Sequence, residues 1–201
     1  METKINFQKR LDAFLTELEE SKRTPSLLLH SCCGPCSSYV LEALVPYFSV
    51  TVFFYNPNIF PEEEYEHRLS EQRRLIDEVW HGRVHLMTLP YEHSEFLAAA
   101  KGLENEPEGG KRCEACFHLR LAKTAEIAKE KGFAYFGTTL TVSPHKNAML
   151  LNRVGHEEEA KAAGAIWLES DFKKKNGYLR SIELSKQYGL YRQQYCGCEF
   201  A

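Results

Sequence analysis

Short apolar runs alternate with longer helical patterns along most of this chain, and that alternation constrains the fold more than any other feature of the sequence. Runs such as Leu27-Leu28-Leu29 and Val50-Thr51-Val52-Phe53-Phe54 have the composition of buried strands. We predict strands at 26–30, 50–55, 84–89, 134–139 and 165–168, and helices at 37–44, 61–80, 92–100, 113–131 and 144–154. This order predicts an α/β fold with a parallel sheet, helices on both faces, and a ligand site at the carboxyl ends of the strands.

The N-terminal residues have the pattern of an amphipathic helix added to this sheet. Phe7, Leu11, Phe14 and Leu18 recur at helical spacing among charged residues, so we predict an N-terminal helical extension over residues 1–24. The chain contains no internal repeat, low-complexity segment or linker that would divide it. We therefore expect one α/β catalytic domain over residues 1–201.

Hydropathy and charge argue against two classes of protein. No apolar run approaches the roughly 20 residues of a membrane span, and charged residues interrupt the N-terminal segment where a signal peptide would be apolar. We expect a cytoplasmic protein with no membrane partner. The net charge of -3 argues against binding nucleic acid through bulk charge, but it is compatible with a local basic face.

The cysteines are clustered in the sequence. The seven cysteines form three tight groups: Cys32, Cys33 and Cys36; Cys113 and Cys116; Cys196 and Cys198. In a chain expected in a reducing compartment, such groups favour metal or redox chemistry over a structural disulfide framework.

Two C-x-x-C motifs, Cys33-Gly34-Pro35-Cys36 and Cys113-Glu114-Ala115-Cys116, together with Cys32 offer five thiols to one centre. An iron–sulfur cluster needs four such thiolates, and a structural zinc site of four cysteines would be satisfied equally well. Thioredoxin-like thiol–disulfide exchange at residues 33–36 is a further interpretation, because a helix N-terminus lowers the pKa of a thiol. Neither thiol–disulfide exchange at residues 33–36 alone nor a chance set of core cysteines explains why the seven cysteines form three groups.

Near the C-terminus, Cys196-Gly197-Cys198 places two thiols one residue apart. A disulfide closing so small a loop restricts little chain entropy, and its strain makes it easy to reduce. This pattern favours a redox couple, and a pair of zinc ligands is the alternative.

Four segments stand in order along the chain: Leu29-His30-Ser31-Cys32-Cys33-Gly34-Pro35-Cys36, Asn56-Pro57-Asn58-Ile59, Glu108-Gly109-Gly110-Lys111-Arg112-Cys113-Glu114-Ala115-Cys116 and Tyr195-Cys196-Gly197-Cys198. Taken together, they resemble the QueH family of cobalamin-independent epoxyqueuosine reductases. Shorter supporting segments include Arg120-Leu121 and Ser143-Pro144-His145-Lys146, and the resemblance spans residues 27–201.

The resemblance implies a HUP (nucleotide-hydrolase-like) fold and an oxidoreductase that acts last in queuosine biosynthesis. Its substrate would be transfer RNA carrying epoxyqueuosine at the wobble position of the anticodon loop, and its electron donor is not identifiable from the sequence. The resemblance assigns a [4Fe–4S] cluster to Cys32, Cys33, Cys113 and Cys116, and a redox-active disulfide to Cys196 and Cys198. It implies no cobalamin, leaves open an additional iron beside the cluster, and gives Cys36 no role.

Two other functions compete with this one: a nucleic-acid-binding module whose cysteines hold zinc, and a general dithiol oxidoreductase that needs no metal. Epoxide reduction also requires a proton donor, for which we consider Asp171, His30, His118 and Tyr178.

A basic segment directly precedes the last cysteine pair. Within residues 172–195, six Lys and Arg residues accompany one acidic residue, and five aromatic residues are interleaved with them. This mixture predicts contact with RNA phosphates and splayed bases; a solvated turn followed by an amphipathic helix is the alternative.

Overall fold

The computed structural model describes residues 5–201, so residues 1–4 of the predicted extension lie outside the described residues. Five parallel strands form one sheet with the order β3-β2-β1-β4-β5, which confirms the predicted parallel α/β class. The strands are β1 (Ser26–His30), β2 (Ser49–Phe54), β3 (Val84–Thr88), β4 (Tyr135–Thr138) and β5 (Ile166–Trp167). The HUP assignment and the single-domain assignment stay predictions.

Seven α-helices flank the sheet in the described part of the chain. They are α1 (Phe7–Glu20), α2 (Gly34–Leu44), α3 (Glu62–Leu75), α4 (His93–Ala100), α5 (Lys111–Glu130), α6 (Ala148–Ala162) and α7 (Gly177–Gln187). A π-helical turn, Ile76–Trp80, extends α3, and a 3-10 turn, Thr139–Val142, follows β4. None of the helices within residues 5–201 has the length and apolar character needed to cross a bilayer.

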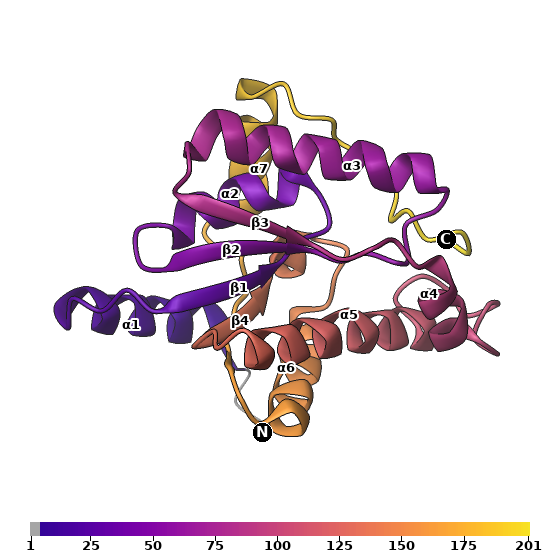
Figure 1. Cartoon of the computed structure of the whole chain (residues 1–201), viewed down its shortest axis with the longest axis horizontal. Coiled ribbons are helices and arrows are strands. Elements are labelled where there is room, and N and C mark those ends of the chain that lie inside the picture. Colours follow the sequence, from indigo (N-terminus) through magenta and orange to yellow (C-terminus); the bar gives the residue numbers. More distant parts are fainter. Residues whose placement is uncertain (1–4) are drawn as a thin grey trace.

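Alternate residues of the strands face two separate apolar cores. Leu27 and Leu29 of β1 pack with α1 and α2, whereas Leu28 packs on the other face with α5 and α6. Figure 1 shows α2 and α3 on one side of the strands and α5 and α6 on the other. All three leucines are fully buried, as expected for a parallel strand covered on both faces.

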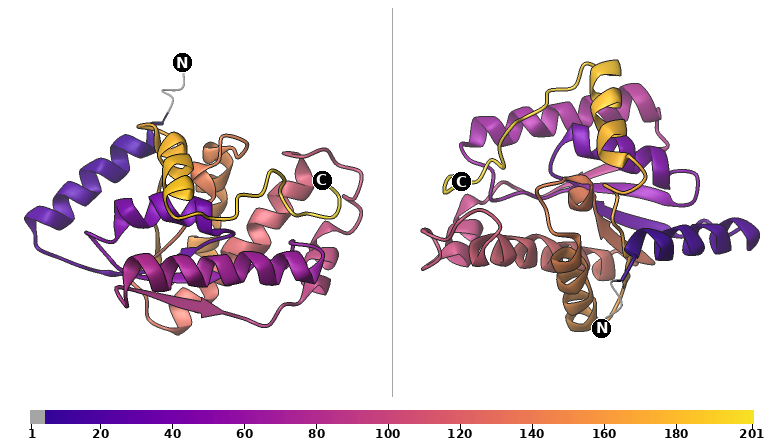
Figure 2. Two further views of the ribbon diagram at one scale, coloured as in Figure 1. Left: turned by 90° about the horizontal axis from the view of Figure 1, so that it is seen from above. Right: turned by 180° about the vertical axis from the view of Figure 1, so that it is seen from behind.

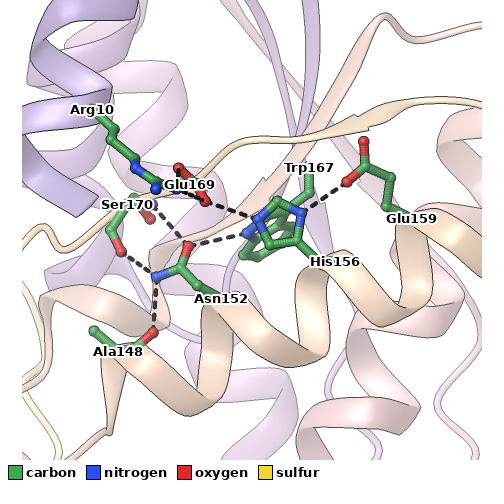
Figure 3. Close-up of polar contacts among 8 residues, drawn as sticks. All are labelled: Arg10, Ala148, Asn152, His156, Glu159, Trp167, Glu169 and Ser170. Atoms are coloured by element: carbon green, nitrogen blue, oxygen red, sulfur yellow. Dashed lines mark hydrogen bonds and ion pairs between the residues drawn. The ribbon is translucent and has the colours of Figure 1, made fainter. Parts of the chain in front are cut away.

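The predicted N-terminal extension forms α1 and packs against the sheet. Arg10 pairs with Glu169 at 2.9 Å, and Glu169 also accepts a bond from His156 of α6 at 2.9 Å. Beside this contact, the buried amide of Asn152 accepts from the Trp167 indole at 3.0 Å and donates to the Ser170 carbonyl at 2.9 Å (Figure 3). These bonds hold α1 and α6 to the segment that contains β5.

The sheet has its switch point between β1 and β4. From β1 the chain proceeds to β2 and β3 in one direction, and from β4 to β5 in the other, so the following loops diverge at the carboxyl edge. Open parallel sheets bind ligands in the crevice at this position. The C-terminal segment 188–201 leaves α7 and ends beside α4, as Figure 2 shows.

Most element boundaries differ from the prediction by one residue or more, and α6 ends at Ala162, well beyond the predicted residue 154. Three of the differences have a clear local cause. Helix α2 starts at Gly34, because Pro35 fits the first turn of a helix, where no backbone donor is needed. Helix α6 starts at Ala148, after Asn147 accepts bonds from the amides of Met149 and Leu150. The expected strand 134–139 ends at Thr138, whose hydroxyl accepts from Leu140 to start the 3-10 turn.

Candidate active site

A buried hydrogen-bond network fixes the loop that follows β1. The Ser31 amide donates to Phe53 at 2.9 Å, and the Ser31 carbonyl accepts from the Asn56 side chain at 2.8 Å. The hydroxyls of Ser31 and Ser37 both donate to the Gln72 side chain of α3, at 2.9 and 2.7 Å. The first cysteine group therefore lies on a rigid turn at the switch point.

The sulfurs of Cys32, Cys33 and Cys36 lie within 4.8 Å of one another, and those of Cys32 and Cys33 are 3.9 Å apart. Cys33 is buried and caps the N-terminus of α2. Hydrogen bonds from the Cys32 and Cys36 thiols hold the pKa of Cys33 well below its usual range, whereas the pKa of Cys36 is raised. Three such sulfurs form a group that could hold a metal.

The second cysteine group lies in the first turns of α5. The Gly109 amide donates to the Cys113 sulfur at 3.2 Å, and burial raises the pKa of the Cys116 thiol to about 11. The buried Arg112 guanidinium donates to the carbonyls of Glu104 at 2.7 Å and Phe200 at 2.8 Å. Arg112 thus connects the loop before α5 with the C-terminal segment.

The third cysteine group is fixed by contacts to its backbone and to one sulfur. The Gly197 carbonyl accepts from the Phe60 amide at 2.8 Å, and the Cys196 carbonyl accepts from buried Arg68 at 3.1 Å. The ammonium of Lys146 lies 3.5 Å from the Cys196 sulfur. Gly197 has φ +93, a left-handed conformation that favours glycine between the two cysteines.

A cavity of about 560 Å³ lies at the carboxyl edge of the sheet and is lined by Cys32, Cys33, Cys36 and Cys196. A small adjoining pocket is lined by Cys113, Cys116, Cys196 and Cys198. Cys196, Arg120 and Lys146 line both. All seven cysteines, which come from three distant parts of the chain, thus line two adjoining spaces that share three residues.

Comparison with known proteins assigns this arrangement to a family. The family model described as Epoxyqueuosine reductase QueH matches residues 27–201. This chain belongs to the QueH family. It is 43% identical to Epoxyqueuosine reductase QueH of Streptococcus pyogenes serotype M1, covering 98% of this chain and 78% of that protein. The corresponding protein of Staphylococcus epidermidis is 43% identical, with 98% and 85% covered. That of Thermotoga maritima is 36% identical, with 88% and 90% covered.

The QueH family is named for an epoxyqueuosine reductase activity, so this chain is an oxidoreductase connected with queuosine. The six cysteines predicted as site residues all line the cavity or its adjoining pocket. All seven cysteines are free thiols in this structure, and the predicted Cys196–Cys198 disulfide stays a prediction. The sulfur of Cys36, to which the resemblance gave no role, lies beside the sulfurs of Cys32 and Cys33.

The residues of this QueH site fit an iron–sulfur cluster in their donor chemistry. Thiolates are the usual ligands of such clusters, and the two C-x-x-C motifs line two adjoining spaces that share Cys196, Arg120 and Lys146. A cation, the Arg120 guanidinium, also lies among these cysteines. Burial by itself would lower the pKa of this guanidinium, but the charges of Cys116 and Cys32 outweigh burial, so the pKa is raised.

The four candidate proton donors lie in different surroundings. His30 is fully buried between Thr138 and the Tyr55 carbonyl, and burial, followed by the charge of Arg120, lowers its pKa to about 3. Asp171 pairs with Lys173 at 2.7 Å, and His118 bonds Glu158 on α6 at 2.6 Å. Among the four, only Tyr178 lines the cavity.

In the structure, the basic segment 172–195 contains a turn followed by helix α7, which is the arrangement given above as the alternative to an RNA-binding surface. Several of its charges are paired. Lys173 contacts Asp171 at 2.7 Å, Lys175 contacts Asp12 at 2.6 Å, and Arg180 contacts Glu42 at 2.7 Å. Phe172 is buried. The residues of this segment that line the cavity are Tyr178, Ser181, Arg192, Gln193, Gln194 and Tyr195.

Sequence reasoning missed two cations of the site. Arg120 and Lys146 occurred in segments that supported the resemblance, but neither was assigned a role. An arginine on an amphipathic helix is ordinarily solvated, so only the packing of α5 reveals that Arg120 is 2% exposed. The position of Lys146 beside Cys196 depends on a contact across 50 residues of chain.

Proposed function

We propose that this chain is the epoxyqueuosine reductase that completes queuosine biosynthesis, reducing epoxyqueuosine to queuosine at the wobble position of transfer RNA. In this proposal Cys32, Cys33, Cys113 and Cys116 hold a [4Fe–4S] cluster, and Cys196 and Cys198 form the redox-active pair. The observation that carries the proposal is the convergence of three distant cysteine groups on two adjoining spaces at the switch point of the sheet.

The reaction balances with two thiols as the source of electrons and protons. Both C–O bonds of the epoxide break, a C=C bond forms, and the oxygen leaves as water with two protons. The two thiols are oxidised to the Cys196–Cys198 disulfide, which an external electron donor must reduce again. A bound cluster supplies one-electron transfer and Lewis-acid chemistry at such a site.

Lys146 gives the two thiols of the pair different surroundings. Its ammonium, with 12% of the side chain exposed, lies 3.5 Å from the Cys196 sulfur. Burial raises the pKa of Cys198, which favours its protonated form. We assign Cys196 as the nucleophilic sulfur and Cys198 as the thiol that retains its proton.

Cys36 is the sulfur of the first group that the proposed cluster does not use. Because it lies within 4.8 Å of the Cys32 and Cys33 sulfurs, it is the residue we assign to an additional iron beside the cluster.

An RNA substrate is supported by the mouth of the cavity. Tyr195 is 54% exposed, and the Arg192 guanidinium lies over the Tyr178 ring at 5.2 Å. Exposed aromatic rings and guanidinium planes are the groups on which splayed bases stack. We place the reaction in the cytoplasm, where thiols are kept reduced and transfer RNA is available.

The test is anaerobic turnover of epoxyqueuosine-containing transfer RNA with dithionite as reductant, followed by mass spectrometry of the nucleosides. We expect Cys196→Ser and Cys198→Ser to retain iron and sulfide but to lose queuosine formation. Serine at Cys32, Cys33, Cys113 or Cys116 should remove most of the iron, because a hydroxyl is a poor iron ligand. Full iron content in three of these four variants would overturn the ligand assignment, and wild-type turnover in either C-terminal variant would overturn the pair.

A further inference from the structure

Three arginines of this structure are almost completely buried, and their partners differ. Arg68, 1% exposed, pairs with the Glu64 carboxylate at 2.6 Å. Arg112, 2% exposed, donates to the carbonyls of Glu104, Glu106 and Phe200. Arg68 is therefore balanced by a carboxylate and Arg112 by three carbonyl acceptors, although Nη2 of Arg68 and Nε of Arg112 have no partner.

Arg120 lacks comparable partners. It is 2% exposed, and its Nε donates to the Cys116 carbonyl at 3.3 Å, one turn earlier on α5. Within residues 5–201 no carboxylate forms an ion pair with it, and this bond to a backbone carbonyl is the one hydrogen bond that its guanidinium donates. The Phe117 ring, whose centroid lies 5.7 Å from the guanidinium carbon, offers only a weaker interaction.

A buried cation without a counter-charge costs several kcal/mol. Helix α5 places Arg120 where the cavity and its adjoining pocket meet, and cysteines of all three groups line these two spaces. Glu108 is the one carboxylate that lines these spaces, and it is 52% exposed and pairs with Lys146 at 3.6 Å. The buried anions that can face Arg120 are therefore thiolates or a centre built on them. Four thiolates outweigh the cationic core of a [4Fe–4S] cluster, so such a centre carries a net negative charge that a cation can compensate.

A phosphate of the RNA substrate is a poorer match for this cation. Arg120 lies at the level of the cysteines and is almost inaccessible to solvent, whereas Arg192 and Tyr195 lie at the mouth. A backbone phosphate would meet the mouth residues first.

We infer that Arg120 is the counter-charge of the iron–sulfur centre and raises its reduction potential. This inference rests on the proposed function, because it requires the cluster. Arg120 is thus a positioning residue that acts through electrostatics: reduction adds an electron to an already anionic centre, and a fixed positive charge beside it stabilises the reduced state.

The experiment is a redox titration of the cluster, followed by visible and paramagnetic resonance spectra, in wild type, Arg120→Met, Arg120→Lys and Lys123→Gln. Arg120→Met has a similar length and no charge, whereas Arg120→Lys retains the charge. Lys123→Gln is the matched control, because it removes the same charge from α5 where Lys123 is partly solvated and pairs with Glu126 at 2.9 Å. We expect Arg120→Met to lower the ratio of reduced to oxidised cluster about tenfold at a fixed ambient potential, equivalent to about 59 mV for one electron. Arg120→Lys should lie between Arg120→Met and wild type, and Lys123→Gln should match wild type.

A second measurement compares melting temperatures with and without the cluster, and Arg120→Met should change them in opposite directions. Without the cluster, Arg120→Met removes an uncompensated buried cation, so its melting temperature should be equal to or above that of wild type. With the cluster, the same substitution should lower the melting temperature. A merely structural arginine would lower it in both forms.

The outcomes separate the inference from the proposed function. Wild-type protein without iron and sulfide would refute the cluster and the inference with it. Wild-type protein with a full cluster, and a potential for Arg120→Met equal to that of Lys123→Gln, would overturn the inference alone. If Arg120→Met folds but holds no cluster, the result for Arg120→Lys decides between the two explanations. A cluster retained in Arg120→Lys supports the counter-charge role of Arg120, and a cluster lost in Arg120→Lys overturns that role.

Discussion

Gly197→Ala tests whether the proposed redox pair, Cys196 and Cys198, is held in one backbone conformation. Gly197 has φ +93, so any residue with a Cβ is strained there by about 1–3 kcal/mol. The added Cβ would also lie 2.9 Å from Nη2 of Arg68. Arg68 has little freedom to retreat, because it is bound to Glu64 at 2.6 Å and to the Cys196 carbonyl at 3.1 Å.

The two effects add to a substantial cost. Weakening the bond from the Arg68 guanidinium to Cys196 costs about 1.5 kcal/mol, so with the backbone strain the docked segment loses roughly 3 kcal/mol. Every 1.4 kcal/mol is a factor of about ten, so local opening of the segment should rise about a hundredfold.

Amide hydrogen exchange with mass spectrometry measures this opening. The Phe60 amide donates to the Gly197 carbonyl, and its exchange should accelerate in Gly197→Ala. Gly189→Ala is the control: Gly189 also has positive φ, +57, but a Cβ there meets nothing within 4 Å. It should leave Phe60 exchange unchanged. Wild-type protection of Phe60 in Gly197→Ala would refute this account of the pair.

Three further predictions address RNA binding, packing and pH. Changing Lys173, Lys174 and Lys175 together to Ala should weaken transfer RNA binding and flatten its salt dependence without altering the cluster spectrum; unchanged binding at low and moderate salt would contradict the predicted basic surface. Gly155→Ala should lower the free energy of unfolding by about 1–3 kcal/mol, because its Cβ would lie 2.1 Å from the Trp167 ring, and a raised melting temperature would disprove this. Burial lowers the pKa of His156, but bonds to Glu169 and Glu159 outweigh this and raise it. A raised folded-state pKa stabilises the fold fully below the ordinary value of 6.5 and progressively less as pH rises above it. His156→Gln should therefore reduce the melting temperature more at pH 6 than at pH 8.5, and equal reductions would oppose the assignment.

The sheet could be predicted because burial on both faces leaves a direct pattern in the sequence. Leu27, Leu28 and Leu29 are all fully buried, as an uninterrupted apolar run in a parallel strand requires. The boundaries of α6 were harder to predict from the sequence. Ser143-Pro144 resembles a helix start, but the side chain of Asn147 caps the helix instead.

The site could be predicted only where its residues are close in sequence. Short spacings indicated the three cysteine groups, and the expected ligand site at the carboxyl ends of parallel strands agrees with the place of the first. The contacts of Lys146 with Cys196, and of Arg68 with the Cys196 backbone, join residues 50 and 128 positions apart. No local pattern encodes such distances, so these cations became visible only in the folded chain.

The most direct test of the account is iron and acid-labile sulfide analysis of anaerobically purified protein, together with its visible spectrum. We expect about four iron and four sulfide per chain and a brown protein, because four thiolates in two pairs suit a [4Fe–4S] cluster. A colourless protein with stoichiometric zinc and no iron would contradict it.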